Sequence, residues 1–456
     1  MKNVALYNLG CKVNSYEMEV MRQSLQERGY QIVPFDGTAD IYIVNTCTVT
    51  NIADRKSRQI LHRAKQLNPR GVVVAVGCYV QAGDRTARRD ECIDLAIGNN
   101  RKKDIADLLE AFLEDRNRNS AVIDINGSCG YEETQLKSSM EHTRAYIKIQ
   151  DGCNQFCSYC AIPYVRGRVR SRRPEDILRE IRGLAAAGYR EVVLTGIHIS
   201  SYGIDFAGGR DAGCSENESY SGYEGSSGLV RLAEQIQEIP GLERIRLGSL
   251  EPRIMTPENV RRLAEIPRLC PHFHLSLQSG CDTVLKRMNR HYTAGEYYSC
   301  VERLRQFFRE PAITTDVIVG FPGETEEEFL RTKAFLEKVC FYEMHVFKYS
   351  RRAGTAADKM PGQVPEQTKI HRSAELLELT ARQAKLFRGR YIGQEAEVLL
   401  EETREMGNRI LRVGHTGDYV KIAVDVTNEA EGERTMPVNS LVKVPVKEFL
   451  TDEILI

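Results

Sequence analysis

Short apolar runs alternate with amphipathic stretches through the N-terminal quarter of this chain. The runs at 4–9, 41–45 and 72–76 are dominated by aliphatic residues, which predicts buried strands. Between them apolar residues recur at helical spacing, and Asn14 with Glu17 three positions later predicts a capped helix start. Strands and helices that alternate in this order predict a doubly wound parallel sheet.

A second region of alternation extends to about residue 390. Its candidate strands lie at 145–150, 191–196, 244–249, 272–277, 313–320 and 343–350. Helical patterns fill the intervals, and Thr293 with Glu296 has the capping-box spacing at the start of one of them. Six strand–helix units are too few for a closed eight-stranded barrel, so we predict an open, partial (β/α)6 barrel. A Gly-, Ser- and Tyr-rich insert at 203–228 predicts a surface loop.

The pattern changes again near residue 391, where helical spacing disappears. Short strand patterns at 396–400, 409–413, 419–424 and 438–444 predict a small β-barrel. The polar segment 116–142 contains Asn-Gly-Ser and predicts a linker. We therefore divide the chain into an N-terminal domain at 1–115, this linker, a partial barrel at 143–390 and a β-barrel at 391–456.

The amino-acid composition of the chain limits the kinds of function that it can have. The chain has 456 residues, with 63 basic and 63 acidic residues, so a nucleic-acid site would have to be a local patch. It shows no signal-peptide or membrane-span pattern, which predicts a cytoplasmic protein without membrane association. Its 13 cysteines are odd in number and widely spread, which argues against a disulfide framework and favours metal or cluster ligation.

The strongest chemical signal is the run Cys153-Asn-Gln-Phe-Cys157-Ser-Tyr-Cys160, directly after the first predicted strand of the central region. Three thiolates at this spacing can hold three irons of a [4Fe–4S] cube and leave the fourth iron without a protein ligand. An open iron can bind a substrate or cofactor, as the open position of a catalytic zinc site does. A structural zinc site is the alternative, but no fourth Cys or His stands in the same loop.

Three further cysteines, Cys11, Cys47 and Cys78, each follow a predicted N-terminal strand within three residues. Loops beyond the carboxyl ends of parallel strands converge on one edge of a sheet. We therefore expect these thiols to meet in space and to offer a second site with an open coordination position. The alternative is that they are small buried thiols without a ligand.

Turns at the ends of the predicted barrel strands lie on the same side as the Cys153 loop. The Gly-Phe-Pro-Gly turn at 320–323 would let the backbone approach a flat ligand such as adenine, although a Pro-Gly turn is usually only a turn. The candidate cofactor contacts are Tyr159, Thr195, Gly196, Gln278, Gly320 and Pro322.

Two basic segments are candidates for an RNA contact. Arg166, Arg168 and Arg170 begin an arginine run after the cysteine loop, and Arg55 and Arg58 lie on a predicted helix of the first domain. Such runs are more often solvated segments, but beside a reactive centre they could clamp phosphate or carboxylate groups. The C-terminal region is acidic overall and would need a local face to bind RNA.

Taken together, these features resemble the radical S-adenosylmethionine (SAM) methylthiotransferases. The C-x3-C-x2-C loop resembles that of the radical SAM superfamily, while the three earlier cysteines and the small β-barrel resemble the methylthiotransferase cluster domain and TRAM domain. The resemblance covers essentially the whole chain. The run Gly10-Cys11-Lys12-Val13-Asn14-Ser15-Tyr16-Glu17 is similar to the branch that acts on N6-threonylcarbamoyladenosine in tRNA.

The resemblance implies two [4Fe–4S] clusters and SAM as cofactors. One cluster, on Cys153, Cys157 and Cys160, would bind SAM and generate a 5′-deoxyadenosyl radical. The other, on Cys11, Cys47 and Cys78, would carry the sulfur that is inserted at C2 of the adenine at tRNA position 37, with a second SAM giving the methyl group. The implied partners are the tRNA anticodon loop, an electron donor of the flavodoxin or ferredoxin type, and a sulfur donor.

Other functions stay open at this point. Related branches modify N6-isopentenyladenosine in tRNA or an aspartate of a ribosomal protein. A zinc-dependent or simple redox protein could use the same thiols, and metal content with optical spectra would separate it. An iron–sulfur electron carrier or RNA-binding scaffold is the non-enzymatic alternative, which SAM cleavage under reducing conditions would exclude.

Overall fold

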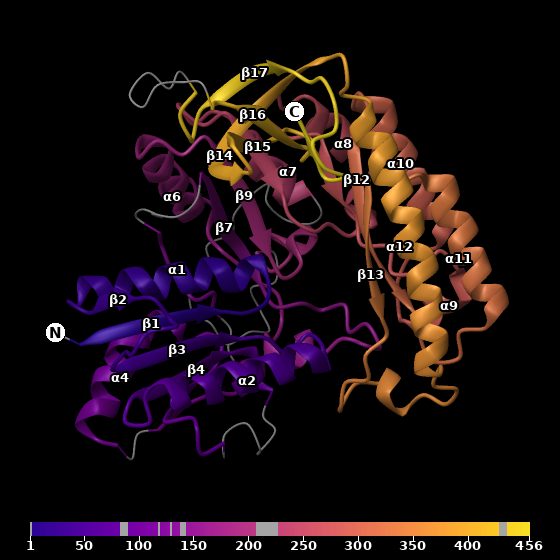
Figure 1. Cartoon of the computed structure of the whole chain (residues 1–456). Coiled ribbons are helices and arrows are strands. Elements are labelled where there is room, and N and C mark those ends of the chain that lie inside the picture. Colours follow the sequence, from indigo (N-terminus) through magenta and orange to yellow (C-terminus); the bar gives the residue numbers. More distant parts are fainter. Residues whose placement is uncertain are drawn as a thin grey trace.

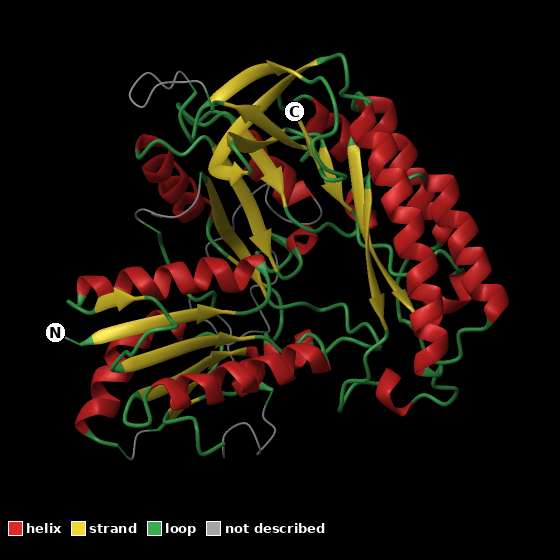
Figure 2. Cartoon of the chain, viewed as in Figure 1, coloured by secondary structure: helices red, strands yellow, loops and turns green. Residues whose placement is uncertain are grey.

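The computed structural model describes residues 2–82, 90–116, 119–127, 130–136, 143–206, 227–427 and 436–456. A sheet domain, a barrel of strands and helices, and a second strand domain follow one another along the chain and pack around a common centre (Figures 1 and 2). Most of the insert expected at 203–228 lies outside the described residues. No helix of the described chain is long and apolar enough to span a membrane.

The described N-terminal residues form a six-stranded parallel sheet of order β2-β1-β3-β4-β5-β6. The strands are β1 (Asn3–Asn8), β2 (Gln31–Val33), β3 (Ile41–Thr46), β4 (Val72–Gly77), β5 (Leu95–Ile97) and β6 (Ser120–Ala121). Helices α1 (Lys12–Glu27) and α4 (Ile105–Glu114) pack on one face, and α2 (Asn51–Leu67) on the other. The doubly wound sheet is confirmed, and β6 extends it into the segment expected to be a linker.

The predicted start of the first helix is wrong. Helix α1 begins at Lys12 with Cys11 as its N-cap residue, so Asn14 and Glu17 lie inside the helix and are buried. Asn14 donates hydrogen bonds to the carbonyls of Leu9 and Thr46, 2.6 and 3.1 Å away, instead of capping the helix. A polar residue followed three positions later by glutamate fits a cap and an internal polar pair equally well.

The central domain is the predicted partial barrel. Its parallel strands are β7 (Arg144–Asp151), β9 (Glu191–Gly196), β10 (Arg244–Leu247), β11 (His272–His274), β12 (Ala312–Val319) and β13 (Glu343–Lys348). Single bridges, Ile245 with Leu269 and Leu250 with Leu275, join the β10-β9-β7 sheet to the β11-β12-β13 sheet. A short antiparallel strand, β8 (Arg170–Ser171), pairs with the end of β7.

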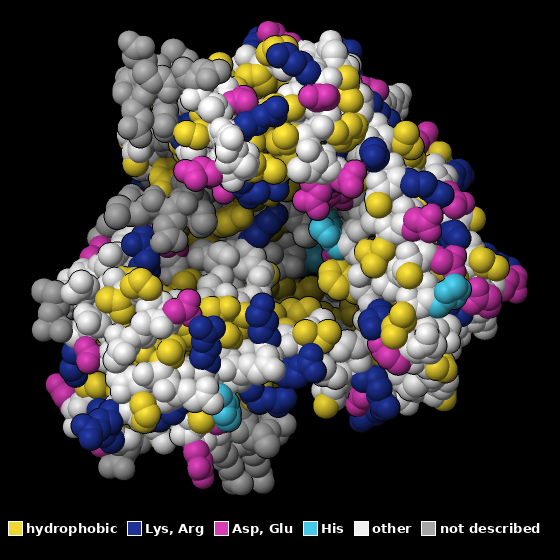
Figure 3. Space-filling model, in the orientation of Figure 1, with side chains coloured by type: hydrophobic (Ala, Val, Ile, Leu, Met, Phe, Trp, Pro, Cys, Tyr) yellow, Lys and Arg dark blue, Asp and Glu magenta, His cyan; other side chains and the backbone are white. Residues whose placement is uncertain are grey.

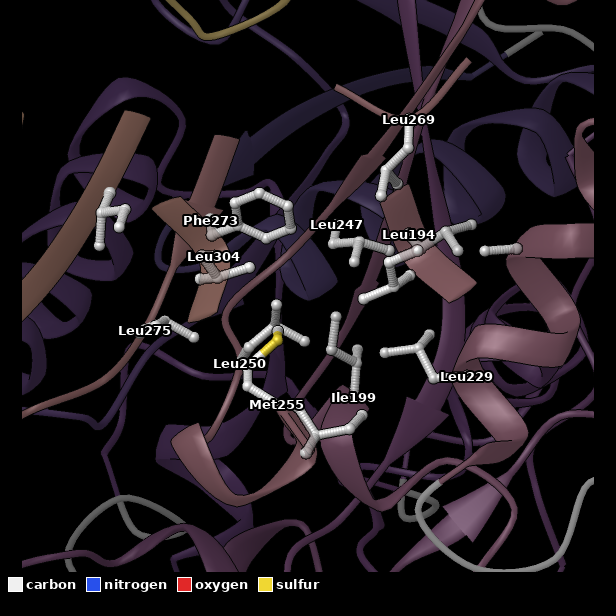
Figure 4. Close-up of a cluster of buried hydrophobic side chains, with 14 of the residues drawn as sticks. Leu194, Ile199, Leu229, Leu247, Leu250, Met255, Leu269, Phe273, Leu275 and Leu304 are labelled. Atoms are coloured by element: carbon white, nitrogen blue, oxygen red, sulfur yellow. The ribbon is translucent and has the colours of Figure 1, made fainter. Parts of the chain in front are cut away.

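Helices cover the outside of these strands. They are α6 (Pro174–Ala186), α7 (Gly228–Ile236), α8 (Pro257–Ala264), α9 (Asp282–Arg287), α10 (Ala294–Phe307), α11 (Glu326–Val339) and α12 (Glu366–Gly389). The predicted capping box of Thr293 and Glu296 starts α10. Leu194, Leu247 and Phe273 of the strands pack with Leu229 of α7 and Leu304 of α10 (Figure 4). Each such buried side chain contributes roughly 1.5–3 kcal/mol, which makes this layer a rigid support for the loops above it.

The C-terminal strands close the other end of the barrel. They are β14 (Glu395–Met406), β15 (Arg409–Thr416), β16 (Lys421–Asp425), β17 (Leu441–Pro445) and β18 (Ile454–Leu455), in sheet order β17-β14-β15-β16-β18. Tyr419 stacks between His272 of β11 and His415 of β15, with ring centroids 5.1 and 4.6 Å apart. The guanidinium groups of Arg144 and Arg246 lie over the same ring. The amino-terminal end of the barrel is therefore plugged, and the carboxyl-terminal end is left for a site.

Candidate active site

The N-terminal cysteine set, Cys11, Cys47 and Cys78, lies at the carboxyl ends of three adjacent strands. Cys47 directly follows β3, Cys78 opens the short helix α3 (Cys78–Gln81) after β4, and Cys11 caps α1 three residues beyond β1. Gly10 has a φ of 103°, and a Cβ there would stand 3.1 Å from the Cys47 Sγ. The glycine lets the Cys11 loop close over Cys47, so the three thiols are brought to one edge as the strand pattern predicted.

Burial shapes the chemistry of these thiols. It raises the pKa of Cys11 and raises the pKa of Cys47 to about 11, with Cys78 adding to both shifts through its charge. Thiols with such pKa values hold their protons at neutral pH when no metal is bound. Binding of iron must therefore release protons from the set.

Arg166 reaches the N-terminal set from the barrel domain. Its Nε donates a hydrogen bond to the Sγ of Cys78 at 3.2 Å, and its two Nη atoms donate to Glu17 and Asn14, each at 2.6 Å. Lys148 of β7 also contacts Glu17, at 2.7 Å. All of these charged groups are buried. This network joins helix α1 to the first barrel strand directly behind the thiols.

The structure corrects the expected RNA clamp in the arginine run. Arg166 is 0% exposed and Arg170 is 2% exposed, and Arg172 is buried in an ion pair with Glu180. A sequence pattern cannot distinguish cations paired inside a domain junction from cations on a solvated segment. Of the three candidates in this run, Arg168 alone is exposed, with its guanidinium 4.5 Å from the Phe156 ring centroid.

Arg55 and Arg58 are exposed on α2, as an RNA contact requires. Basic side chains gather on the face of the molecule that carries this helix (Figure 3). The helix starts after Thr50, whose side chain accepts a hydrogen bond from the Ala53 backbone. Its apolar side, including Leu61, packs on the sheet and leaves the arginines outward.

The barrel cysteine set, Cys153, Cys157 and Cys160, occupies the loop between β7 and α5 (Ile162–Val165). Backbone hydrogen bonds from Cys153 to Gly167 and from Cys160 to the Cys157 carbonyl, 3.0 and 2.9 Å long, curl the loop. Burial raises the pKa of Cys153 to about 11 and the pKa of Cys160 to about 12. These thiols also perturb one another electrostatically, so they lie close together.

Arg290 is a functional residue that sequence reasoning missed. It lies between α9 and α10, and its Nη1 donates a hydrogen bond to the Cys157 Sγ at 3.2 Å. Its Nε donates to the hydroxyl of Tyr292 at 3.0 Å. The sequence separation of 133 residues hides this contact from any local pattern. Each cysteine set therefore has one arginine that donates to one of its sulfurs.

His198 and Glu251 were also missed, and they stand beside the barrel set. His198 follows β9, its backbone N–H donates to Gln150 at 2.8 Å, and its Nδ1 lies 2.6 Å from the Ser201 hydroxyl. Its Nε2 is buried without a hydrogen-bond partner among the described residues and lies 3.9 Å from Glu251. Burial lowers the pKa of His198 to about 4, so the ring is neutral at pH 7.

The two glycines expected to approach a ligand have different surroundings. Gly196 follows Thr195 at the end of β9, where a Cβ would stand 2.9 Å from the Gln150 carbonyl oxygen. Gly320 has a φ of 70°, and the space for a Cβ there is filled by the Lys369 side chain of α12. At Gly320 the need for glycine comes from helix packing, and that side of the turn is closed to a ligand.

The remaining candidate cofactor contacts lie around the barrel set. The Tyr159 ring meets the Phe321 ring edge-on at 6.4 Å, next to the buried Pro322. Gln278 follows β11 with a φ of 72° and bridges to Val317 of β12. A hollow opens between the three parts of the molecule, with basic, histidine and apolar side chains on its walls (Figure 3).

Both cysteine sets fit an iron–sulfur cluster by the chemistry of their donors. Each offers three thiols, free of disulfides, beyond the carboxyl end of parallel strands: three strands for the N-terminal set and β7 for the barrel set. Each also receives an N–H donor from a buried or half-buried arginine, as cluster sulfurs commonly do. A partial barrel with a C-x3-C-x2-C loop at its mouth, beside a second cysteine set, defines the class of radical SAM enzymes with an auxiliary cluster.

Comparison with known families agrees with this class. Residues 147–336 match the radical SAM superfamily, and residues 3–98 match the "uncharacterized protein family UPF0004". The fold is similar to that of the solved radical SAM methyltransferase TsrM from Kitasatospora setae, with a TM-score of 0.55 over 78% of this chain and 74% of that one. The sequence identity in that comparison is 15%, so the likeness concerns the fold alone.

Relatives of known function are similar over nearly the full length. The chain is 38% identical to the threonylcarbamoyladenosine tRNA methylthiotransferase MtaB of Bacillus subtilis, over 95% of this chain and 92% of the relative. It is 37% identical to MtaB of Aquifex aeolicus, over 92% and 96%. A tRNA-2-methylthio-N(6)-dimethylallyladenosine synthase of Methylacidiphilum infernorum is 33% identical, over 88% and 84%. The chain therefore belongs to the radical SAM methylthiotransferase family.

Proposed function

We propose that this protein adds a methylthio group to C2 of N6-threonylcarbamoyladenosine at position 37 of tRNA, next to the anticodon. The observation that carries the proposal is the pair of three-thiol sets, one beyond the strands of the N-terminal sheet and one beyond β7 of the barrel, with Arg166 of the barrel domain donating a hydrogen bond to Cys78 of the other set. The names of the MtaB relatives support the choice of substrate. When bound, the barrel cluster and SAM supply a 5′-deoxyadenosyl radical, and the auxiliary cluster supplies sulfur.

The residues of this chain hold and shield that chemistry. Arg166 and Arg290 direct N–H groups at thiolate sulfurs, which offsets the negative charge that three thiolates bring into a buried site. Tyr419 and its histidine neighbours plug the floor of the barrel, which excludes water from that side of a reactive intermediate. The base itself would enter by being splayed out of the anticodon loop.

Exposed cations of the N-terminal domain would hold the tRNA backbone. Arg55 and Arg58 extend from α2, while the buried arginines of the 166–173 run stay in the domain junction. Phosphate contacts of this kind position an RNA without reading its bases. We also propose a cytoplasmic site of action, an electron donor of the flavodoxin or ferredoxin type, and a separate sulfur donor, since turnover consumes both electrons and sulfur.

Nucleoside analysis of a gene-deletion strain tests the substrate. We expect 2-methylthio-N6-threonylcarbamoyladenosine to disappear and the unthiolated threonylcarbamoyl nucleoside to accumulate, with recovery when the wild-type gene is restored. A control strain carries the Cys157→Ala gene and should resemble the deletion. Loss of the methylthio group from isopentenyladenosine, or a change only in a ribosomal protein, would contradict this substrate and leave the two-cluster chemistry standing.

A further inference from the structure

Lys12 carries an unpaired ammonium group directly beside the N-terminal cysteine set. It follows Cys11 as the first residue of α1, and its side chain is exposed. It makes no hydrogen bond or ion pair with any residue that the structure describes. The other lysines near this set behave differently, because Lys102 and Lys148 are both paired with Glu17. Within the described part of the chain, Lys12 is thus a cation without a hydrogen-bond or ion-pair partner.

Lys12 begins helix α1, which packs against β7 and β9 of the barrel. It interacts electrostatically with Tyr419, Arg246 and Arg144, and it contributes to the field at His272. These residues form the plug at the amino-terminal end of the barrel. The side chain of Lys12 stays open to solvent where α1 meets the barrel.

The two arginines near Lys12 are already paired with carboxylates. Arg246 donates to Glu191 at 2.7 Å, and Arg144 donates to Glu401 at 3.1 Å. By contrast, the Nδ1 atom of His272, a residue that is 8% exposed, has no hydrogen-bond partner among the described residues. A buried polar atom without a partner is costly unless a ligand or water satisfies it. Of the charged groups named here, the ammonium of Lys12 is therefore the one that is both exposed and available to an anionic ligand group.

We propose that Lys12 binds the carboxylate of the N6-threonylcarbamoyl group and so sets the substrate specificity of this site. The inference rests on the proposed function. In adenine, C2 and C6 both flank N1, so a base whose C2 meets the N-terminal cysteine set has its N6 substituent within reach of the residue after Cys11. A dimethylallyl group has no charge and would leave the ammonium unpaired, which disfavours it.

This assignment replaces the arginine run as the carboxylate partner. Of the sequence-based candidates Arg166, Arg168 and Arg170, the first and the last are buried, and Arg166 is held by Glu17 and Asn14. Arg168 is exposed, but its guanidinium lies over the Phe156 ring of the barrel cysteine loop. A cation that is already paired gains little from a further anion, whereas an unpaired ammonium gains a charge-assisted hydrogen bond. Lys12 has the charge, the exposure and the position that this contact requires.

The test pairs two enzymes with two RNAs. One anticodon stem–loop carries threonylcarbamoyladenosine, and the other carries the same group with its carboxylate converted to a carboxamide. Dissociation constants are measured with anaerobically reconstituted wild-type protein and with Lys12→Met, which removes the charge and keeps much of the side-chain length. Lys12→Arg retains the charge, and Lys338→Met on α11 is the matched control away from the site.

The wild type should bind the carboxylate RNA about ten- to hundredfold more tightly than the carboxamide RNA, the range for a hydrogen bond between charged groups. Lys12→Met should bind both RNAs with the weaker affinity, whereas Lys12→Arg and Lys338→Met should keep the preference. Iron content and the paramagnetic resonance spectrum of each variant establish that both clusters are loaded, independently of activity.

Two results would overturn the assignment. An equal loss of affinity for both RNAs in Lys12→Met would make Lys12 a backbone contact, and equal binding of the two RNAs by the wild type would exclude carboxylate recognition even if Lys12→Met failed to fold. The proposed function fails in a separate way. If the proposed function is wrong, wild-type protein would add the methylthio group to an RNA that carries dimethylallyladenosine and leave the threonylcarbamoyl RNA unchanged.

Discussion

The Nε of Arg166 lies 3.2 Å from the Sγ of Cys78 and donates a hydrogen bond to it. Arg166 belongs to the barrel domain, directly after the barrel cysteine loop, whereas Cys78 belongs to the N-terminal sheet. The contact therefore links the barrel domain to the N-terminal cysteine set. Glu17 holds the guanidinium in place at 2.6 Å, so helix α1 decides where the hydrogen bond points.

Removing this donor should change the redox properties of the auxiliary cluster. Hydrogen bonds to cluster sulfurs raise the reduction potential because they stabilise the reduced, more negative state. We expect Arg166→Gln to lower the potential of the cluster on the N-terminal set by about 50 mV, since about 59 mV corresponds to about 1.4 kcal/mol for one electron. A redox titration followed by paramagnetic resonance, in protein whose barrel cysteines are alanine, measures it. Arg168→Gln changes an exposed neighbouring arginine and should leave the potential unchanged. An equal shift in Arg168→Gln would show that the hydrogen bond from Arg166 to Cys78 is not the cause.

The two cysteine sets should bind iron independently. Anaerobic reconstitution of the wild type should yield about eight irons and eight sulfides per chain. Changing Cys153, Cys157 and Cys160 together to alanine should leave about four, because the N-terminal set is complete without them. Colorimetric iron and sulfide assays measure both numbers. A wild type that never exceeds four irons would rule out two clusters.

The two sets should also separate by function. We expect Cys157→Ala to abolish reductive SAM cleavage, because only the barrel set sits at the mouth of the barrel near His198 and Gly196. Cys47→Ala should still form 5′-deoxyadenosine but give no methylthiolated RNA. Chromatography of the nucleosides and SAM products after a single incubation measures both outputs. SAM cleavage at the wild-type rate by Cys157→Ala would reverse the assignment.

Glu17 should stabilise the domain junction in a pH-dependent way. Burial alone would raise its pKa, but Arg166, Lys102 and Lys148 outweigh burial and hold the pKa of Glu17 well below its usual value. A carboxylate with a depressed pKa contributes its full stability above about pH 4.5 and loses it as the pH falls further. Glu17→Gln should therefore cost about 3–5 kcal/mol at pH 7, because it leaves buried cations short of a partner.

Urea unfolding of the cluster-free protein at several pH values measures this contribution. The difference between wild type and Glu17→Gln should be constant from about pH 6 to about pH 8 and should shrink below about pH 4.5. Glu327→Gln, on the exposed side of α11, is a control that should change stability little at any of these pH values. A difference that grows as the pH falls would contradict a depressed pKa for Glu17.

Exposed arginines of α2 should contribute to tRNA binding through charge. The double variant Arg55→Ala, Arg58→Ala should weaken tRNA binding several-fold at moderate salt. The slope of log affinity against log salt should fall by roughly 0.7–0.9 for each phosphate that the variant no longer binds. Titrations at three or more salt concentrations measure the slope, and Arg331→Ala on α11 is the control. An unchanged slope would place the tRNA on another face.

The sequence alone was enough to predict the parts of this protein that follow from local spacing. Aliphatic runs predicted the major strands of the sheet and barrel, because burial on both faces of a parallel strand demands a continuous apolar run. The position of Cys11, Cys47 and Cys78 after their strands was enough to predict one shared edge, since parallel strands end together. Short strands such as β5 and β6 were missed because two or three residues carry too little pattern.

Tertiary structure alone decided which charged residues are available. Arg166, Arg170 and Lys12 look alike as basic positions near cysteines, yet two are buried and one is exposed. Glu17 was predicted to be the third residue of a helix-capping box, and it is instead the anion of a domain junction. The contact of Arg290 with Cys157 spans 133 residues. Which charged residues pair in this way depends on how two domains pack against each other. The free energy of that packing comes from contacts between residues far apart in the chain, so no local sequence pattern predicts it.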